Sequence, residues 1–279
     1  MSLKLMYITN DPDIATVAQS VGIDRIFIDM ECLGKEDRQG GMDTVKSHHT
    51  VEDVRRIAQV LTTSELLVRV NPIHEKTDAY PSSREEIDAV IAAGADILML
   101  PYFKTADEVK AFISLVGGRA KTMLLMETAQ ANENADEILD IDGIDEVHIG
   151  LNDMHLAYKK RFMFELLTDG TVEQLCEKCR KRGLPYGFGG IARLGYGMLP
   201  AENVITEHYR LGSTKAILSR SFCNASTIGD PAELRALFEL ETAKIRRFEE
   251  KVAKYSAEEY EENRREVERL VKIIVSGQE

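Results

Sequence analysis

Three charged residues near the carboxyl ends of apolar runs are the first candidates for chemistry in this chain. Glu127 follows Thr122-Met-Leu-Leu-Met, Asp153 follows Val147-His-Ile-Gly-Leu-Asn, and Arg69 lies in Leu66-Leu-Val-Arg-Val-Asn-Pro. Each run has the composition of a buried parallel strand, and α/β barrels carry their chemistry where such strands end. Two carboxylates can hold one divalent cation, and arginine adds a fixed positive charge. The pattern predicts a metal site that binds an oxyanion.

Each candidate also has a purely structural interpretation. A carboxylate after a strand can simply cap the following helix. Glu127 and Asp153, however, follow the fifth and sixth predicted strands with no strand between them, so both can reach one cation. For Arg69 the alternative is a salt bridge inside the barrel mouth, because a buried guanidinium needs an anionic partner.

Acidic residues and histidines near the second predicted strand are further candidates. Asp29 and Glu31 flank Met30 and face the same side of the strand. They can assist a metal-bound water, hold Arg69 or simply begin the next loop, and these three interpretations stay open. His48 and His49 end that loop. A histidine there can act as a proton acceptor near neutral pH, and a solvated loop residue is the alternative.

The composition indicates a globular protein that acts on small molecules. The chain has 279 residues, 44% of them hydrophobic, and a formal net charge of -12, while α/β barrels of about 250 residues form single domains. This charge repels nucleic acids and anionic membranes, so we expect neither as a partner. An anionic substrate would be attracted by local positive charges such as Arg69 and a bound cation.

The cysteines predict a reducing compartment. Four cysteines in a chain of this length do not form a disulfide framework, and no stretch resembles a signal peptide or a membrane span. We therefore expect a cytoplasmic protein. Cys176 and Cys179 have the spacing of half a zinc or redox motif, but they lie in an amphipathic helical pattern with no second pair. We interpret them as ordinary helical cysteines.

Apolar runs alternate with helical segments along the chain, which is typical of βα units around a parallel sheet. The eight predicted strands are Lys4 to Thr9, Arg25 to Met30, Leu66 to Val70, Ile97 to Leu100, Lys121 to Met126, Glu146 to Ile149, Tyr186 to Gly189 and Lys215 to Leu218. Eight such strands are the number that a closed barrel needs. The sequence therefore predicts a (β/α)8 TIM barrel.

Helix boundaries support this prediction. Four segments pair a hydroxyl N-cap candidate with an acid three residues later, and they begin at Thr50, Ser83, Thr105 and Ser256. Four glycines fall near helix ends just before the next strand, as C-cap glycines do, at positions Gly22, Gly94, Gly183 and Gly212.

Two segments depart from this alternation. The polar stretch from Glu31 to His49 is too long for a routine connection and is a candidate active-site loop. We expect the barrel to span residues 1–230 and a helical extension to span residues 231–279. The apolar faces of this extension comprise Leu234, Phe238, Ile245, Phe248 and Val252, and then Tyr260, Val267, Leu270 and Ile274. Such an extension packs on its own barrel or on a neighbouring subunit, and we predict a homo-oligomer.

At these residues the chain resembles the HpcH/HpaI aldolase and citrate lyase family of metal-dependent pyruvate or oxaloacetate aldolases and acyl-CoA lyases on a (β/α)8 barrel. The similarity runs from about residue 20 to about residue 222. The matching stretches are Phe27-Ile-Asp-Met-Glu, Leu67-Val-Arg-Val-Asn-Pro, Leu98-Met-Leu-Pro, Leu125-Met-Glu-Thr with Ala131-Asn, and Gly143-Ile-Asp-Glu-Val-His-Ile-Gly-Leu-Asn-Asp-Met.

The resemblance implies roles for individual residues. Glu127 and Asp153 would bind Mg²⁺, Mn²⁺ or another divalent cation, and Arg69 would contact the enolpyruvate oxygen. The backbone near Gly150, Leu151 and Asn152 would receive the substrate carboxylate. The implied reaction is reversible cleavage of a 4-hydroxy-2-oxo acid to pyruvate and an aldehyde through a metal-bound enolate, and His48, His49 or a metal-bound water would take the proton of the 4-hydroxyl group.

Departures from the family pattern bear on the choice of reaction. The aldolase branch often has a histidine, and the lyase branch a second acid, where this chain has Cys32, so the base stays open. The lyase branch usually has a lysine directly after the proline that follows the fourth strand, whereas here Tyr102 follows Pro101 and Lys104 comes later. This favours an aldolase over an acyl-CoA lyase of the citrate lyase type. A non-catalytic barrel that binds oxo acids is a third alternative.

Overall fold

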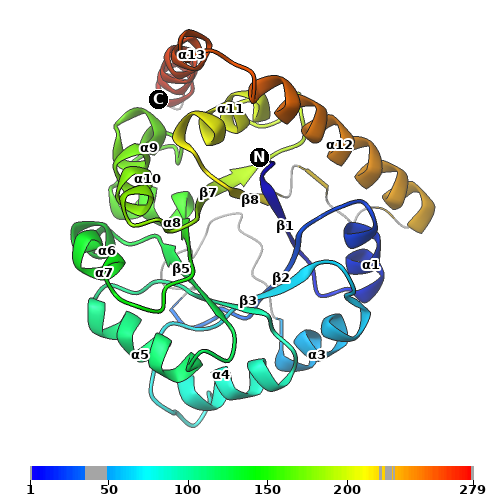
Figure 1. Ribbon diagram of the computed structural model, residues 1–279, viewed down its shortest axis with the longest axis vertical. Coiled ribbons are helices and arrows are strands. Elements are labelled where there is room, and N and C mark those ends of the chain that lie inside the picture. Colours follow the sequence, from blue (N-terminus) through cyan, green and yellow to red (C-terminus); the bar gives the residue numbers. More distant parts are fainter. Residues whose placement is uncertain (1, 35–48, 220–221, 224–227, 229, 278–279) are drawn as a thin grey trace.

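Eight parallel strands form a closed barrel in the order β1 to β8 (Figure 1). The computed structural model describes residues 2–34, 49–219, 222–223, 228 and 230–277. This closed ring of parallel strands confirms the predicted TIM barrel. The strands are β1 (Lys4–Ile8), β2 (Arg25–Asp29), β3 (Glu65–Arg69), β4 (Ile97–Leu100), β5 (Lys121–Met126), β6 (Glu146–Ile149), β7 (Tyr186–Ile191) and β8 (Lys215–Leu218).

The predicted strand bounds agree closely with those observed. β4, β5, β6 and β8 have the predicted bounds, and the other four strands differ by one or two residues at their ends. The largest difference is in β7, which continues to Ile191 rather than ending at Gly189. Its pairing with β8 shifts register between Gly187 and Gly190. The glycine-rich run is thus part of the strand, where the lack of side chains permits an irregular ladder.

Helices surround the barrel between and after the strands (Figure 1). They are α1 (Pro12–Ser20), α3 (Val51–Val60), α4 (Ser83–Ala92), α5 (Ala106–Val116), α6 (Ala129–Glu133), α7 (Ala135–Leu139), α8 (Leu151–Ala157), α9 (Glu165–Thr168), α10 (Thr171–Lys181), α11 (Ala201–Leu211), α12 (Pro231–Val252) and α13 (Ala257–Ser276).

Capping boxes begin four of these helices. Thr50, Thr105 and Ser256 are N-caps, as the sequence predicts. The prediction for α4 is wrong by one residue, because Ser82 is the cap and Glu85 its reciprocal partner. The hydroxyl of Ser83 instead accepts a hydrogen bond from the backbone N–H of His74 at 2.8 Å.

One type of connection recurs where the chain leads from a helix into β2, β4 and β6. An aspartate placed just before the strand accepts the backbone N–H of the preceding strand of the barrel, at 2.7 to 2.8 Å. The three aspartate and N–H pairs are Asp24 with Leu5, Asp96 with Leu66, and Asp145 with Thr122. A glycine two residues before each aspartate has a positive φ, so it lets the chain leave the helix and turn into the strand.

The inward-facing residues of the strands form their own apolar cluster. It comprises Met6, Phe27, Leu67, Ile97, Met99, Met123 and Leu125, while a larger cluster fills the space between the sheet and the helices. Side chains alternate along a strand, so residues two positions beyond this cluster also point into the barrel. Three charged residues stand two positions after members of this cluster, namely Asp29 after Phe27, Arg69 after Leu67, and Glu127 after Leu125.

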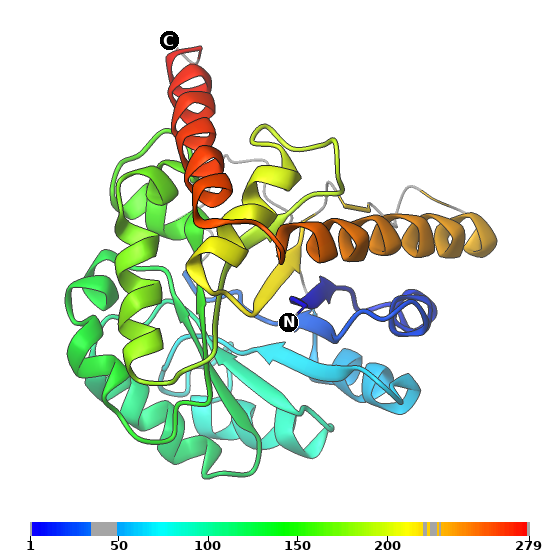
Figure 2. The same ribbon diagram turned by 45° about the horizontal axis from the view of Figure 1, so that its top comes forward.

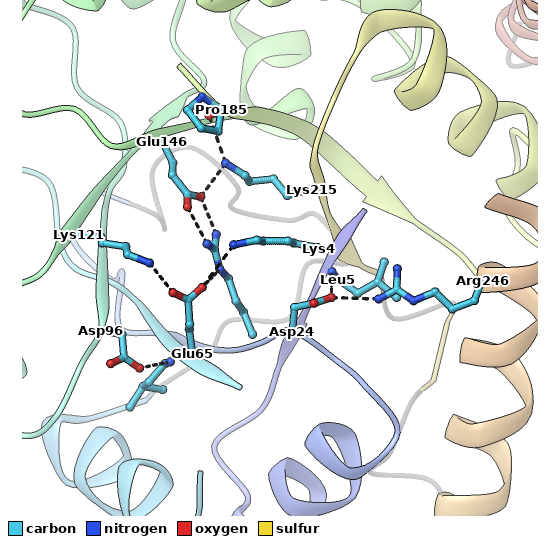
Figure 3. Close-up of polar contacts among 12 residues, drawn as sticks. Lys4, Leu5, Asp24, Glu65, Asp96, Lys121, Glu146, Pro185, Lys215 and Arg246 are labelled. Atoms are coloured by element: carbon cyan, nitrogen blue, oxygen red, sulfur yellow. Dashed lines mark hydrogen bonds and ion pairs between the residues drawn. The ribbon is translucent and has the colours of Figure 1, made fainter. Parts of the chain in front are cut away.

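The amino end of the barrel is closed by buried ion pairs among residues that begin strands (Figure 3). Arg25 donates two hydrogen bonds to Glu146, at 2.6 and 2.7 Å, and one to Glu65 at 2.9 Å. Lys215 also lies 2.6 Å from Glu146. Although burial opposes its ionisation, these two cations lower the pKa of Glu146 to about 2. This layer is the polar floor of the barrel, and the candidate residues lie at the opposite end.

The two C-terminal helices pack on the barrel of the same chain. α12 runs beside α1 and α11, and α13 lies against α11 and α9 (Figures 1 and 2). Phe238 of α12 is fully buried, and its ring meets the ring of Tyr7 edge-on with 5.0 Å between centroids. Val267 and Val271 of α13 are buried as well. One of the two expected arrangements, packing on the chain's own barrel, is therefore observed. The boundary at residue 230 stays a prediction.

No helix within the described residues is long and apolar enough to cross a membrane.

Candidate active site at the carboxyl end of the barrel

Arg69 and Asp29 form the centre of the site. They are direct partners in the register of β2 and β3, and both face inward. The guanidinium donates from Nε to Oδ1 and from Nη2 to Oδ2 of Asp29, each at 2.8 Å. The paired geometry matches the planar fork of arginine to the two oxygens of a carboxylate. Arg69 is therefore held in one orientation at the end of its strand.

Glu31 provides a second carboxylate for Arg69. Its Oε2 atom lies 3.3 Å from Nη1 of Arg69, and its side chain is only 1% exposed. Burial alone would lower the pKa of Arg69, but Asp29, Glu31 and Glu127 together raise it above its ordinary value. Of the three interpretations open for Asp29 and Glu31, the structure shows that they hold Arg69. For Arg69 the sequence left a salt bridge in the barrel mouth as an alternative, and this salt bridge is present. The contact of Arg69 with substrate stays a prediction.

Glu127 directly follows β5 and is 4% exposed. Its Oε1 atom accepts the backbone N–H of Tyr102 at 3.0 Å. Tyr102 has φ of 49°, an uncommon left-handed conformation for a tyrosine that is typical of strained functional segments. The backbone after β4 thus fixes one oxygen of Glu127.

Gly150 provides the space that the other oxygen of Glu127 occupies. A Cβ atom on Gly150 would lie 2.8 Å from Cβ and 2.9 Å from Oε2 of Glu127. Any side chain at this position would push the carboxylate away. Gly150 is also the N-cap of α8, and no side chain caps this helix end.

Asp153 lies in the first turn of α8 and is 7% exposed. β5 and β6 are neighbours, and Met126 pairs with Ile149, so Glu127 and Gly150 begin the two following segments side by side. Asp153 comes three residues later. The backbone of Gly150, Leu151 and Asn152, where the sequence predicts a substrate carboxylate, leads from Gly150 beside Glu127 to Asp153 at the beginning of α8.

The donor atoms fit a hard divalent cation. Glu127 and Asp153 provide carboxylate oxygens, which Mg²⁺ and Mn²⁺ prefer, and Mg²⁺ is commonly held by one or two carboxylates with water and substrate oxygens completing its shell. The residues described in the structure include no cluster of three or more His, Cys, Asp or Glu side chains arranged to hold a metal ion. The metal site formed by Glu127 and Asp153 stays a prediction.

The histidines expected as bases are placed only in part. His48 lies outside the described residues. His49 lies beside Asp29, and its Nδ1 atom accepts the backbone N–H of Asp29 at 3.0 Å. That nitrogen is used to fix the end of the loop to β2, so His49 could take a proton only through Nε2. Catalysis by His49 stays a prediction.

Sequence reasoning missed two polar residues beside the site, Asn71 and Glu86. Asn71 is 7% exposed and hydrogen-bonds the backbone that follows Glu31, and Glu86 is 4% exposed on α4. One signal was available for Asn71, since it stands two residues after Arg69 and therefore faces the same side of the chain. The position of Glu86 depends on how α4 packs, which no local pattern indicates.

Comparisons with known proteins identify the family of the chain and support its fold. The family model described as HpcH/HpaI aldolase/citrate lyase matches residues 4–183, more than half of the chain. The chain belongs to this family. The HpcH/HpaI aldolases and lyases generally depend on a divalent cation, in keeping with the carboxylates at the rim. A search among curated proteins finds no match.

Solved structures agree with the family fold. An HpcH/HpaI aldolase from Desulfitobacterium hafniense DCB-2 is 16% identical with a TM-score of 0.60, covering 88% of this chain and 93% of that chain. An HpcH/HpaI aldolase/citrate lyase family protein from Burkholderia cenocepacia J2315 is 14% identical with a TM-score of 0.59, covering 84% and 95%. The citrate synthase SbnG is 14% identical with a TM-score of 0.60, covering 84% and 92%. At these identities the likeness concerns the fold alone.

Proposed function

We propose that the protein is a metal-dependent aldolase that reversibly cleaves a 4-hydroxy-2-oxo acid into pyruvate and an aldehyde. One observation carries the proposal. Two buried carboxylates, Glu127 and Asp153, follow adjacent strands at the same end of the barrel at which Arg69 is held by Asp29 and Glu31. Family membership supports carbon–carbon bond cleavage, and the aldolase assignment is our finer inference.

The proposed role of the acids follows from their chemistry. A divalent cation held by Glu127 and Asp153 would act as a Lewis acid toward the keto oxygen of the substrate. Tyr102 donates to one oxygen of Glu127, and Gly150 makes room for the other. These contacts fix the carboxylate before substrate arrives, which lowers the reorganisation needed during the reaction.

Arg69 would stabilise the negative charge that develops when the bond beside the carbonyl breaks. Its positive charge is permanent, and its contacts with Asp29 and Glu31 hold it at the rim. The charge on the keto oxygen grows toward the transition state, so a fixed cation there accelerates the chemical step. The substrate carboxylate would meet the backbone N–H groups that begin α8, where no side chain caps the helix.

The test combines metal binding with turnover. Glu127→Ala and Asp153→Ala should each abolish cleavage of 4-hydroxy-2-oxo acids and should weaken Mn²⁺ binding. Cleavage is measured by coupling the release of pyruvate to lactate dehydrogenase, and Mn²⁺ binding is measured by calorimetry. Glu133→Ala removes an exposed carboxylate from α6, the helix that follows β5, and should change neither quantity.

Two outcomes would contradict the proposal. Unchanged Mn²⁺ affinity in both alanine variants would remove the metal site from this rim. A wild-type protein that exchanges the methyl protons of pyruvate but cleaves no hydroxy-oxo acid would instead be a binding or regulatory barrel that has lost turnover.

A further inference from the structure

Asn71 connects the end of β3 to the start of the segment that follows β2. Its Oδ1 atom accepts the backbone N–H groups of Cys32 and Leu33, each at 2.9 Å. The thiol of Cys32 also lies 3.4 Å from this oxygen. One amide oxygen therefore fixes two consecutive peptide units of the neighbouring chain segment.

Glu86 of α4 holds Asn71 from the other side. Its Oε1 atom accepts both the side-chain amide of Asn71, at 2.9 Å, and the backbone N–H of Asn71, at 3.2 Å. Within the described residues, Oε2 of Glu86 is buried and has no hydrogen-bond partner. Burial raises the pKa of Glu86. Because Oε1 of Glu86 already accepts the backbone N–H of Asn71, the amide nitrogen Nδ2 faces Glu86, and Oδ1 faces the donating N–H groups of Cys32 and Leu33.

These contacts act on the residue just before Cys32. The backbone N–H of Glu31 donates to Asp29 at 3.2 Å, and Asn71 fixes the two peptides that follow. Glu31 is thus held on both sides, with its carboxylate 3.3 Å from Arg69. We propose that Asn71 and Glu86 are positioning residues that hold Glu31 against Arg69 and so fix the guanidinium for the reaction. The catalytic part of this inference rests on the proposed aldolase function.

The first experiment measures steady-state cleavage by Asn71→Ala, Glu86→Ala and Glu86→Gln. The two alanine variants should lower kcat by roughly 10- to 100-fold with little change in KM, because small displacements of a catalytic group cost rate rather than affinity. Glu86→Gln keeps an acceptor for the amide of Asn71 and should recover most of the rate. Asp88→Asn, an exposed change on the same helix, is the control and should match wild type.

A double-mutant cycle separates positioning from general damage. In a Glu31→Gln background the charge that Asn71 positions is already gone, so adding Asn71→Ala should lower kcat by no more than about twofold. Mn²⁺ affinity should stay at the wild-type value in Asn71→Ala. Equal effects of Asn71→Ala in both backgrounds, or a loss of Mn²⁺ binding, would overturn the proposal.

A thiol-labelling assay keeps the inference testable without any turnover. Cys176, Cys179 and Cys223 are at most 5% exposed, while Cys32 is half-buried and contacts Asn71. Labelling of Cys32 should become severalfold faster in Asn71→Ala and Glu86→Ala, and Cys32→Ser should abolish the signal. Faster labelling in a protein without aldolase activity would refute the proposed function and keep the positioning role. Unchanged labelling in both alanine variants would refute the positioning role.

Discussion

Loss of Arg69 should damage both the chemical step and the fold, and the two effects can be measured separately. Removing a donor that stabilises a developing oxyanion typically lowers turnover about 100- to 1000-fold, or roughly 3 to 4 kcal/mol. Asp29 and Glu31 are 3% and 1% exposed, so Arg69→Ala also leaves two buried carboxylates without their cation. Breaking such a buried pair costs about 3 to 5 kcal/mol of folding free energy.

Three variants separate these contributions. Arg69→Ala should lose both turnover and stability, whereas Arg69→Lys keeps the charge, loses the planar fork and should still turn over poorly. Arg69→Met combined with Asp29→Asn removes one charge of each sign, so it should regain much of the lost stability without regaining activity. Coupled pyruvate release measures turnover, and urea unfolding measures stability. If Arg69→Ala keeps turnover within about threefold of wild type, Arg69 is structural and the electrostatic part of the mechanism is wrong.

Two further predictions concern the amino end of the barrel and the helical extension. The pKa of Glu146 falls from 4.5 in the unfolded chain to about 2, so its ion pairs contribute about 3 kcal/mol above pH 4.5, and this is lost as the pH falls through 4.5 toward 2. Urea unfolding should show that Glu146→Gln has already lost this stability at pH 7. If wild type and Glu146→Gln show the same dependence of stability on pH below 4.5, the prediction is wrong. Truncation after Asp230 should lower thermal stability, because α12 buries Phe238 and Glu249 accepts the backbone N–H of Leu3 at 2.7 Å. We also propose that the extension mediates subunit assembly, and sedimentation of the full chain as a monomer at micromolar concentration would exclude that role.

Local features of the sequence were sufficient to predict the barrel. Strands buried on both faces need continuous apolar runs, and the helices between them need caps, so both leave signals within a few residues. The connections from helix to strand also leave local signals, such as Gly22 and Asp24 before β2. Ser82 shows the limit of this reasoning. Two adjacent serines both have hydroxyls, and the choice between them depended on His74, which lies in the preceding loop and uses Ser83.

The candidate site was predictable only in its outline. Glu127, Asp153 and Arg69 could be assigned to one rim, because the ends of parallel strands meet there in any such barrel. The partners of Arg69 could not be chosen from sequence, since Asp29 and Glu31 were equally suited to water, loop and ion-pair roles. The register of the barrel identifies Asp29 as a partner of Arg69, because pairing of β2 with β3 places the two residues directly opposite each other.

The order of strands and helices, the closed barrel and the rim that carries the charged residues could be derived from the sequence, because they depend on periodicity and on neighbours along the chain. The three-dimensional packing was needed to show which carboxylates hold Arg69, how Glu86 orients Asn71, and which surface the extension covers. Each of these contacts joins residues on separate elements, and most of the partners are far apart in the sequence, as in the pair formed by Asn71 and Cys32, 39 residues apart. Their energies depend on burial and exact distance, and a linear pattern contains neither.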